Sequence, residues 1–199
     1  MPGEEVLLAE FERPGQAPEE EELLAAEIRA GSAPAVERFY ELHGARMKSI
    51  AANLLGNLAD AEDAVQDSFV KIYRGAASFR GGSRFSTWAY RVLVNSCYDM
   101  LRKRRRGPEP AEGAETSRLT APATDHPLRL SLEACLEDLH PRRRAVFLLF
   151  EVEGFTHREV GDILGLPEAT SRTLLFEAKR DLQRSLWKRG AVGVAGAGP

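Results

Sequence analysis

Four side chains at a 4-3-4 spacing, followed by a run of cations, form the most chemically distinctive stretch of the sequence. They are Arg91, Asn95, Tyr98 and Arg102, and residues 102–106 are all basic. Cations pair with phosphates, an amide can hydrogen-bond base edges, and an aromatic ring offers a stacking surface. One or two cations suffice to complement a helix dipole, at about 0.3–1 kcal/mol each. A run of this length therefore indicates a surface that binds a phosphate backbone.

A helix that begins near Phe85 positions these side chains. From there to Leu101 apolar residues recur at intervals of three and four, the pattern of an amphipathic helix. The apolar face consists of Phe85, Trp88, Ala89, Val92, Leu93, Ser96, Cys97, Met100 and Leu101. Thr87 joins the polar stripe on the opposite side. We therefore predict that the helix buries one side in a bundle and presents the other to nucleic acid.

Two helices are predicted ahead of it. Ser32 caps the first, Pro34 is tolerated in its first turn, and Gly56 and Asn57 end it. Its apolar face consists of Val36, Phe39, Tyr40, His43, Met47, Ile50, Ala51, Leu54 and Leu55. The second helix begins near Asp60 and has the apolar stripe Ala61, Val65, Phe69, Ile72 and Tyr73. A glycine-containing loop over residues 77–84 leads to the helix at Phe85.

The face opposite the second apolar stripe is polar apart from one residue. It carries Asp63, Gln66, Asp67, Val70 and Arg74. A mixed polar surface with one apolar side chain suits an interface with a charged helix. The residues by themselves favour the simpler interpretation, a solvated face.

A second block of helical pattern has the features of a helix-turn-helix. Thr156 and Glu159 form a capping box at a helix start, Gly165 ends that helix, and Pro167 lies at the start of the next. Two helices joined by a tight glycine-containing turn suit a DNA-binding unit. An ordinary helical hairpin fits the same residues, so this block alone leaves both alternatives open.

The second helix of this pair divides into two faces at about 100° per residue. The inward face consists of Ser171, Leu174, Leu175, Ala178 and Leu182. The outward face consists of Ala169, Arg172, Thr173, Phe176, Arg180 and Gln183. An outward phenylalanine among polar residues has no core to join. Phe176 could contact a thymine methyl group, and Arg172 could bind guanine.

Composition divides the chain into five parts. The first, residues 1–31, is an acidic leader with nine acidic and two basic residues among the first 30. A short helix within it stops at Gly31, and we favour a solvated tail over a shield for basic surfaces. The other parts are helical domains over 32–106 and 128–188, a flexible linker over 107–127 and a disordered tail over 189–199. The predicted fold is all-α, with two small helical bundles joined by the linker.

No motif of a common enzyme class is present. GxGxxG, P-loop and GxSxG patterns are absent, the four histidines form no HxxxH pair, and Cys97 and Cys135 are isolated. We therefore expect no enzymatic activity, no cofactor and no metal site. No apolar run approaches the ~20 residues that cross a bilayer. The amino terminus also lacks the pattern of a signal peptide, so we expect a cytoplasmic protein.

Two stretches resemble a known family. The segments DAEDAVQDSF and FSTWAYRVLVN resemble region 2, and the segment from HPRRRAVFLLF to LLFEAKRDL resembles region 4, of bacterial sigma factors of the extracytoplasmic-function (ECF) group. The resemblance covers about residues 32–106 and 132–187, with a dissimilar linker between them. Two such regions in this order match the minimal architecture of the group.

The resemblance implies a protein that directs core RNA polymerase to specific promoters and assists strand opening for transcription initiation. The implied partners are the clamp helices and flap of the polymerase, promoter DNA in duplex and single-stranded form, and an anti-sigma factor. Residues implied in binding core polymerase are Asp60, Asp63, Gln66, Asp67 and Val70. Those implied at the minus-ten element, where the loop at 77–84 holds a flipped base, are Phe79, Arg80, Arg84, Thr87, Trp88, Arg91, Asn95, Tyr98, Arg102, Arg104 and Arg105. Those implied at the minus-thirty-five element are Ala169, Thr170, Arg172, Thr173, Phe176, Glu177, Lys179 and Arg180.

The recognition helix departs from the family pattern. It reads ATSRTLLFEAK where relatives often have GTVKSRLFRAR, so Leu174 and Glu177 replace frequent arginines. A carboxylate at Glu177 would repel phosphate or select cytosine, and we expect an atypical upstream element. Two alternatives to a sigma factor stay open: a free-standing helix-turn-helix regulator, and a sigma-like adaptor that sequesters an anti-sigma factor.

Overall fold

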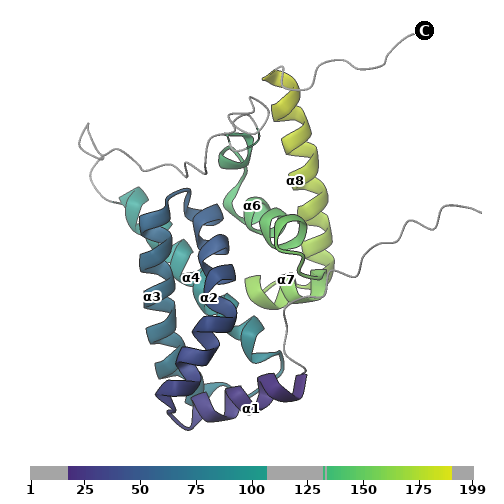
Figure 1. Cartoon of the computed structure of the whole chain (residues 1–199). Helices are drawn as coiled ribbons and strands as arrows, with labels where there is room; N and C mark the ends of the chain where they lie inside the picture. The colour runs from purple at the N-terminus through teal and green to yellow at the C-terminus, as the bar shows by residue number, and fades with distance from the viewer. Residues whose placement is uncertain (1–17, 107–131, 133, 190–199) are drawn as a thin grey trace, which may run out of the picture.

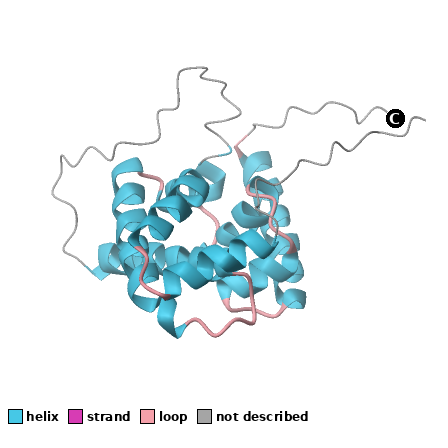
Figure 2. Ribbon diagram, turned by 60° about the horizontal axis from the view of Figure 1, so that its bottom comes forward, coloured by secondary structure: helices cyan, strands magenta, loops and turns pink. Residues whose placement is uncertain are grey.

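The computed structural model describes residues 18–106, 132 and 134–189, which form helices joined by short turns. Figure 1 shows two groups of helices side by side, with α1 to α4 in one and α6 to α8 in the other. Figure 2 shows helices and loops and no strand in this part of the chain. The all-α prediction with two bundles is confirmed. The predicted linker, the first 17 residues and the tail beyond Arg189 lie outside the described residues.

Local capping sets the ends of α2, Ala33–Leu55. The Ser32 hydroxyl accepts a hydrogen bond from the Ala35 amide at 3.3 Å, and Gly56 closes the helix with a φ of 70°. Glycine adopts this left-handed backbone conformation without steric cost. Both predicted ends of this helix are therefore confirmed.

The next helix, α3 (Leu58–Gly75), begins slightly earlier than predicted. The Asn57 side chain accepts hydrogen bonds from two amides of the first turn, one of them that of Asp60 at 3.2 Å, and so acts as the cap. Tyr40 and Tyr73, which were expected in the core, are 54% and 48% exposed. Their rings lie beside the groove between α2 and α3 instead of inside the bundle.

The helix α4, Phe85–Arg106, follows a single 3-10 turn, η1 (Ala76–Ser78), and is covered on two sides. The predicted apolar face supplies the fully buried residues Phe85, Ala89, Leu93 and Cys97. Tyr90 and Val94 are also buried, although the amphipathic pattern did not place them in a core. The reason is tertiary: the second group of helices packs against this other side of α4.

The second group consists of a short helical segment at 134–137, α6 (Pro141–Phe147), a π-helical turn η2 (Leu148–Val152), α7 (His157–Leu164) and α8 (Glu168–Lys188). Thr156 and Glu159 form the predicted capping box at the start of α7, and Gly165 ends it with a φ of 66°. A Cβ at Gly161 would lie 2.7 Å from the Leu166 carbonyl oxygen, so glycine permits the close approach of α7 to the turn. The helix-turn-helix is confirmed.

The two groups share one apolar core. Buried residues of α2 and α4 are continuous with Leu149 of η2, Phe155, and Val160 and Ile163 of α7. Polar contacts reinforce the junction, because the Arg144 guanidinium donates to the Asn53 carbonyl oxygen at 2.6 Å. The chain therefore folds into two groups of helices that are docked on each other.

An additional helix, α1 (Pro18–Arg29), packs across the end of the first group (Figure 1). Leu24, Ala25 and Ile28 are at most 4% exposed, so residues 18–29 of the acidic leader are anchored by their own apolar face. The expectation of a solvated tail is wrong for this part, because the spacing of these three residues gives the helix a buried side. The predicted stop at Gly31 is confirmed by its φ of 86°.

None of the described helices is both long and apolar enough to cross a membrane.

Candidate nucleic-acid interface

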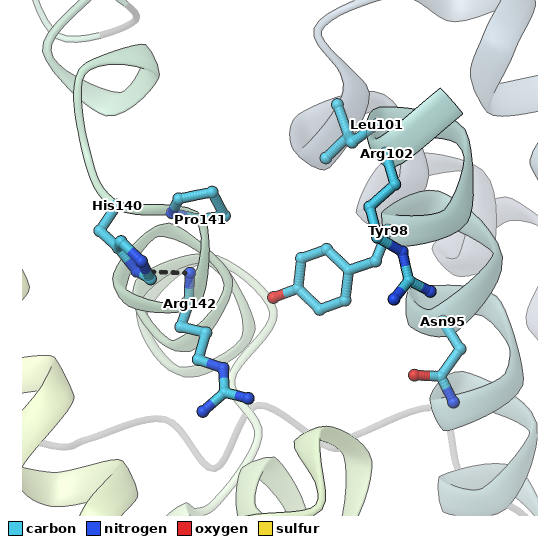
Figure 3. A pocket seen from close by; sticks show the side chains of 7 residues that line it. All are labelled: Asn95, Tyr98, Leu101, Arg102, His140, Pro141 and Arg142. Atoms are coloured by element: carbon cyan, nitrogen blue, oxygen red, sulfur yellow. Dashed lines mark hydrogen bonds between the residues drawn. The ribbon is translucent and has the colours of Figure 1, made fainter. Parts of the chain in front are cut away.

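The predicted polar stripe of α4 lies at a cleft between the two groups of helices. Arg91 and Asn95 are exposed and Tyr98 is half-buried. Figure 3 shows Asn95, Tyr98 and Arg102 on α4 facing His140, Pro141 and Arg142 at the start of α6. This arrangement combines an amide, a phenol and cations along one groove, which is the chemistry that base edges and phosphates require.

Tyr98 is only partly available in this arrangement. Its ring projects from α4 toward Pro141 and Arg142 (Figure 3). Its hydroxyl is buried and has no hydrogen-bond partner among the described residues, and burial raises the pKa of Tyr98 to about 12. An unpaired buried hydroxyl carries a desolvation cost. The start of α6 therefore covers a side chain that stacking on a base would need exposed.

Thr87 does not belong to an exposed stripe. It is 4% exposed and lies on the side of α4 that the second group covers, where the Tyr90 and Phe155 ring centroids are 5.1 Å apart. The sequence placed it outward because helical periodicity on one chain segment cannot reveal a second packing partner. In this arrangement Thr87 is not available to DNA.

A clasp of long-range contacts holds this junction together. Arg46 of α2 donates to the Glu153 carbonyl oxygen, and its guanidinium lies 4.0 Å from the centroid of the Phe155 ring. The Glu153 carboxylate accepts hydrogen bonds from Arg46 at 3.4 Å and from the Ser49 hydroxyl at 2.9 Å. Local sequence patterns do not predict these contacts, because they join positions more than 100 residues apart.

The loop before α4 is fixed by aromatic packing at one end. Phe79 lies 5.4 Å, centroid to centroid, from both Phe85 and Trp88, so Phe79 and Trp88 are half-buried structural residues as well as candidate DNA contacts. Between Phe79 and the start of α4, Arg80 is exposed, and Gly81 and Gly82 have φ values of 84° and 94°. Such backbone conformations favour glycine and leave the loop without side chains where a strand could approach.

The basic end of α4 is partly neutralised within the chain. Arg102 pairs with Asp99, and Arg104 pairs with Asp60 and donates to the Leu55 carbonyl oxygen at 3.4 Å. Arg105 lies in the helix, but its side chain is outside the described part. Of this basic run, Arg102 lines the cleft of Figure 3, where Arg142 of α6 adds a second cation.

The outward face of α3 is as predicted for most of its members. Asp63, Gln66 and Asp67 are exposed, and Val70 is 47% exposed. Asp60 differs, because its pairing with Arg104 of α4 turns it toward the bundle. Four of the five residues implied in polymerase binding therefore share an accessible surface, while Asp60 has a structural contact.

The outward face of α8 is open over its whole length. Its exposed residues are Ala169, Arg172, Thr173, Phe176, Lys179, Arg180 and Gln183, with Thr170 half-buried beside them. Phe176 is 67% exposed, and packing among the described residues does not account for an aromatic side chain at this position. Arg172 pairs with Glu168 at 2.6 Å, and Lys179 pairs with Glu151 at the same distance. These exposed ion pairs are weak and leave the cations free to exchange partners.

Glu177 is held away from this outward face. Its carboxylate pairs with the Arg143 guanidinium of α6 at 2.8 Å, and Arg143 also binds Asp181 at 2.6 Å. The expectation that Glu177 repels phosphate or selects cytosine is not supported by this placement. Its residue type is explained by a contact between helices, which the sequence of α8 alone could not reveal.

Two docked helical groups, one with a cationic cleft and one with an exposed recognition helix, define a two-part nucleic-acid-binding protein. The sequence comparisons agree with this class. Residues 39–107 match Sigma-70 region 2, and residues 129–182 match Sigma-70, region 4. The chain belongs to the sigma-70 family of RNA polymerase sigma factors. Several of the relatives it matches are ECF sigma factors. Members of this family are transcription-initiation factors and not enzymes.

Individual relatives show the extent of the similarity. The ECF RNA polymerase sigma factor SigE of Mycolicibacterium smegmatis is 32% identical over 158 residues, which cover 75% of this chain and 60% of SigE. The RNA polymerase sigma factor CarQ of Myxococcus xanthus is 30% identical over 141 residues, which cover 69% of this chain and 81% of CarQ. The chain thus spans less than two thirds of the length of SigE.

Solved structures share the fold. The sigma factor RpoE in complex with the anti-sigma factor NepR from Bartonella quintana gives a TM-score of 0.57 at 26% identity, covering 85% of this chain and 95% of RpoE. CnrH in complex with the cytosolic domain of CnrY gives a TM-score of 0.65 at 23% identity, covering 84% of this chain and 97% of CnrH.

Proposed function

We propose that this chain directs core RNA polymerase to specific promoters and assists strand opening for transcription initiation. The observation that carries the proposal is the construction of α4. The helix buries one side in the bundle and lines a cleft with Asn95, Tyr98 and Arg102 on another. Such a helix suits a mechanism of differential binding, in which an opened strand is bound better than a duplex.

Three surfaces divide the work in this proposal. The exposed α3 face with Asp63, Gln66 and Asp67 binds the clamp helices of the polymerase. The loop at 77–84 and the α4 cleft bind the melted minus-ten element, with one base flipped into the loop. The outward face of α8 reads the minus-thirty-five element in the major groove, where Arg172 and Phe176 supply the contacts.

Simultaneous use of both DNA-reading surfaces requires the helical groups to separate. Elements roughly 25 base pairs apart lie about 85 Å apart along duplex DNA, at ~3.4 Å per base pair. Here α4 and α7 are in direct contact, and the start of α6 covers Tyr98. We infer that the docked arrangement belongs to the free chain, and that the two groups move apart when the chain binds polymerase.

An anti-sigma factor is a proposed regulatory partner. The relative RpoE was solved bound to the anti-sigma factor NepR, and it covers most of this chain. By similarity, we propose that such a partner stabilises a form in which the helical groups cannot reach both promoter elements. Because template and polymerase are in the cytoplasm of bacteria, we place the chain there.

Run-off transcription with purified core polymerase tests the proposal. The template is a promoter selected from a randomised pool, since the recognition helix departs from the usual pattern. A sigma factor supports initiation when added to core enzyme alone. A free-standing regulator binds duplex DNA without supporting initiation, and an adaptor binds an anti-sigma factor but neither promoter nor polymerase. Either of the last two results would overturn the proposal.

A further inference from the structure

Among the described residues, Glu21 of α1 is the only charged residue that is fully buried, at 7% exposure. It lies in a run of four glutamates whose other members, Glu19, Glu20 and Glu22, are exposed. Burial of a carboxylate is costly unless its oxygens are paired. The contacts of Glu21 therefore indicate a specific task that its neighbours in the sequence do not share.

Both oxygens of Glu21 bind the start of α4. Oε1 accepts a hydrogen bond from the Ser86 amide at 2.9 Å, and Oε2 pairs with the Arg84 guanidinium at 2.7 Å. Arg84 precedes the helix and has no acceptor atom, so it cannot cap the first turn itself. Glu21 supplies that cap from a position 65 residues away, where its charge also complements the amino end of the helix dipole.

This cap fixes one end of the loop that leads into α4. The other end is held by the ring of Phe79, which packs on Phe85 and Trp88. Between the two anchors, Arg80, Gly81 and Gly82 are exposed. The span that is open to a ligand is therefore short and is held at both ends.

We propose that Glu21 is a positioning residue for capture of the flipped minus-ten base. It sets the first turn of α4 and the direction of Arg84, and thereby holds the loop at 77–84 in the shape that receives the base. The inference rests on the proposed function, because it assumes that this loop is the base pocket. Glu21 itself contacts no DNA in this proposal, since it is buried beneath Arg84 and Ser86.

The experiment measures how strongly holoenzyme distinguishes a base from an abasic site. Core polymerase with the full-length chain is bound to fork-junction DNA, which carries either the unpaired minus-ten base or an abasic site at that position. The ratio of the two affinities reports the pocket, whereas a general loss of folding or polymerase binding lowers both affinities together. The variants are Glu21→Ala and Glu21→Gln, and the matched control is Glu22→Gln. Glu22 is exposed, and in the described contacts it pairs only with Arg29.

The expected result is a loss of discrimination in Glu21→Ala by about 2- to 30-fold, the range that corresponds to loss of a helix N-cap. Glu21→Gln keeps an acceptor for the Ser86 amide and should recover part of the ratio, while Glu22→Gln should match the wild type. If Glu21→Ala discriminates as well as wild type, Glu21 has no positioning role. If the wild type itself shows no discrimination, the assignment of the loop as a base pocket fails, which is a distinct outcome.

Discussion

The two surfaces that are proposed to meet DNA are presented in opposite ways. On α8, Arg172 and Thr173 are exposed and Phe176 is 67% exposed. On α4, Thr87 is 4% exposed, and the Tyr98 hydroxyl is buried beside the start of α6. The helix that is proposed to read duplex DNA, α8, is thus accessible, whereas α4, which is proposed to bind the opened strand, must first be uncovered. The packing itself favours an order in which upstream duplex is contacted before the melted strand.

The largest effect is expected from reversing charge on the α3 face. Asp63→Arg with Asp67→Arg should weaken binding of core polymerase by at least about 30-fold, because like charges then meet across the interface. Transcription should fall with it, since α4 stays covered, while binding of α8 to upstream duplex should persist. Pull-down of core enzyme is the measurement. The matched control is Glu37→Arg with Glu41→Arg on α2, which changes net charge equally at exposed positions. Equal binding by both double variants would remove α3 from the interface.

A smaller loss is expected on the exposed recognition helix. Arg172→Ala should cost about 1–3 kcal/mol in binding upstream duplex, the usual value of a good arginine–guanine contact. Arg184→Ala on the same helix is the control, because Arg184 is exposed and pairs with Asp181 at 3.4 Å. Titration of a labelled minus-thirty-five duplex measures both. If Arg172→Ala and Arg184→Ala bind the duplex with equal affinity, Arg172 reads no base and α8 contacts only the DNA backbone.

Removing the Arg46 contacts that hold the two groups together should make the α4 surface more accessible, as the α8 surface already is. Arg46→Ala takes away the contacts to Glu153 and the stacking on Phe155, which we expect to raise the open population by about 5- to 30-fold, or 1–2 kcal/mol. Binding of the free chain to a single-stranded minus-ten oligonucleotide should rise accordingly. The control is Lys48→Ala, because Lys48 pairs with Glu62 inside the first group of helices. This variant should leave the affinity for the oligonucleotide unchanged. An unaltered affinity in Arg46→Ala would mean that the clasp does not control access to α4.

The smallest effect distinguishes two tyrosines of α4. Tyr98→Phe removes a buried hydroxyl that has no partner in the described part of the chain, and should leave the free energy of unfolding unchanged or raise it by up to ~1 kcal/mol. Tyr90→Phe removes a hydroxyl that lies 3.1 Å from His43 Nδ1, and should lower it by about 1 kcal/mol. Urea denaturation compares the two. A larger loss in Tyr98→Phe than in Tyr90→Phe would contradict the described packing around α6.

Local signals predicted the helices and their ends because caps and apolar spacing act within a few residues. Ser32, Gly56, Thr156 and Gly165 do in the structure what their types indicate. The errors have a different origin, in contacts between distant segments. The pairing of Glu177 with Arg143 is one example, and the burial of Thr87 by the second group is another. A pattern along one helix reports one buried side, and cannot show that a second partner covers another.

The burial of Glu21 is another contact between distant segments that the local sequence does not predict. Its run of four glutamates predicts a solvated face, and three of them are exposed. Only the approach of α1 to the start of α4 selects Glu21 for burial. The division of surfaces among polymerase, minus-ten and minus-thirty-five contacts came from the family resemblance, and those residue assignments stay predictions.

Site-specific crosslinking from α4 tests the central claim most directly. A photoreactive amino acid in place of Asn95 is compared in the free chain and in holoenzyme on a selected promoter. We expect crosslinks to the non-template strand of the minus-ten element in holoenzyme, and crosslinks to the start of α6 in the free chain. Crosslinks from holoenzyme that go only to protein, or only to fully paired upstream duplex, would contradict it.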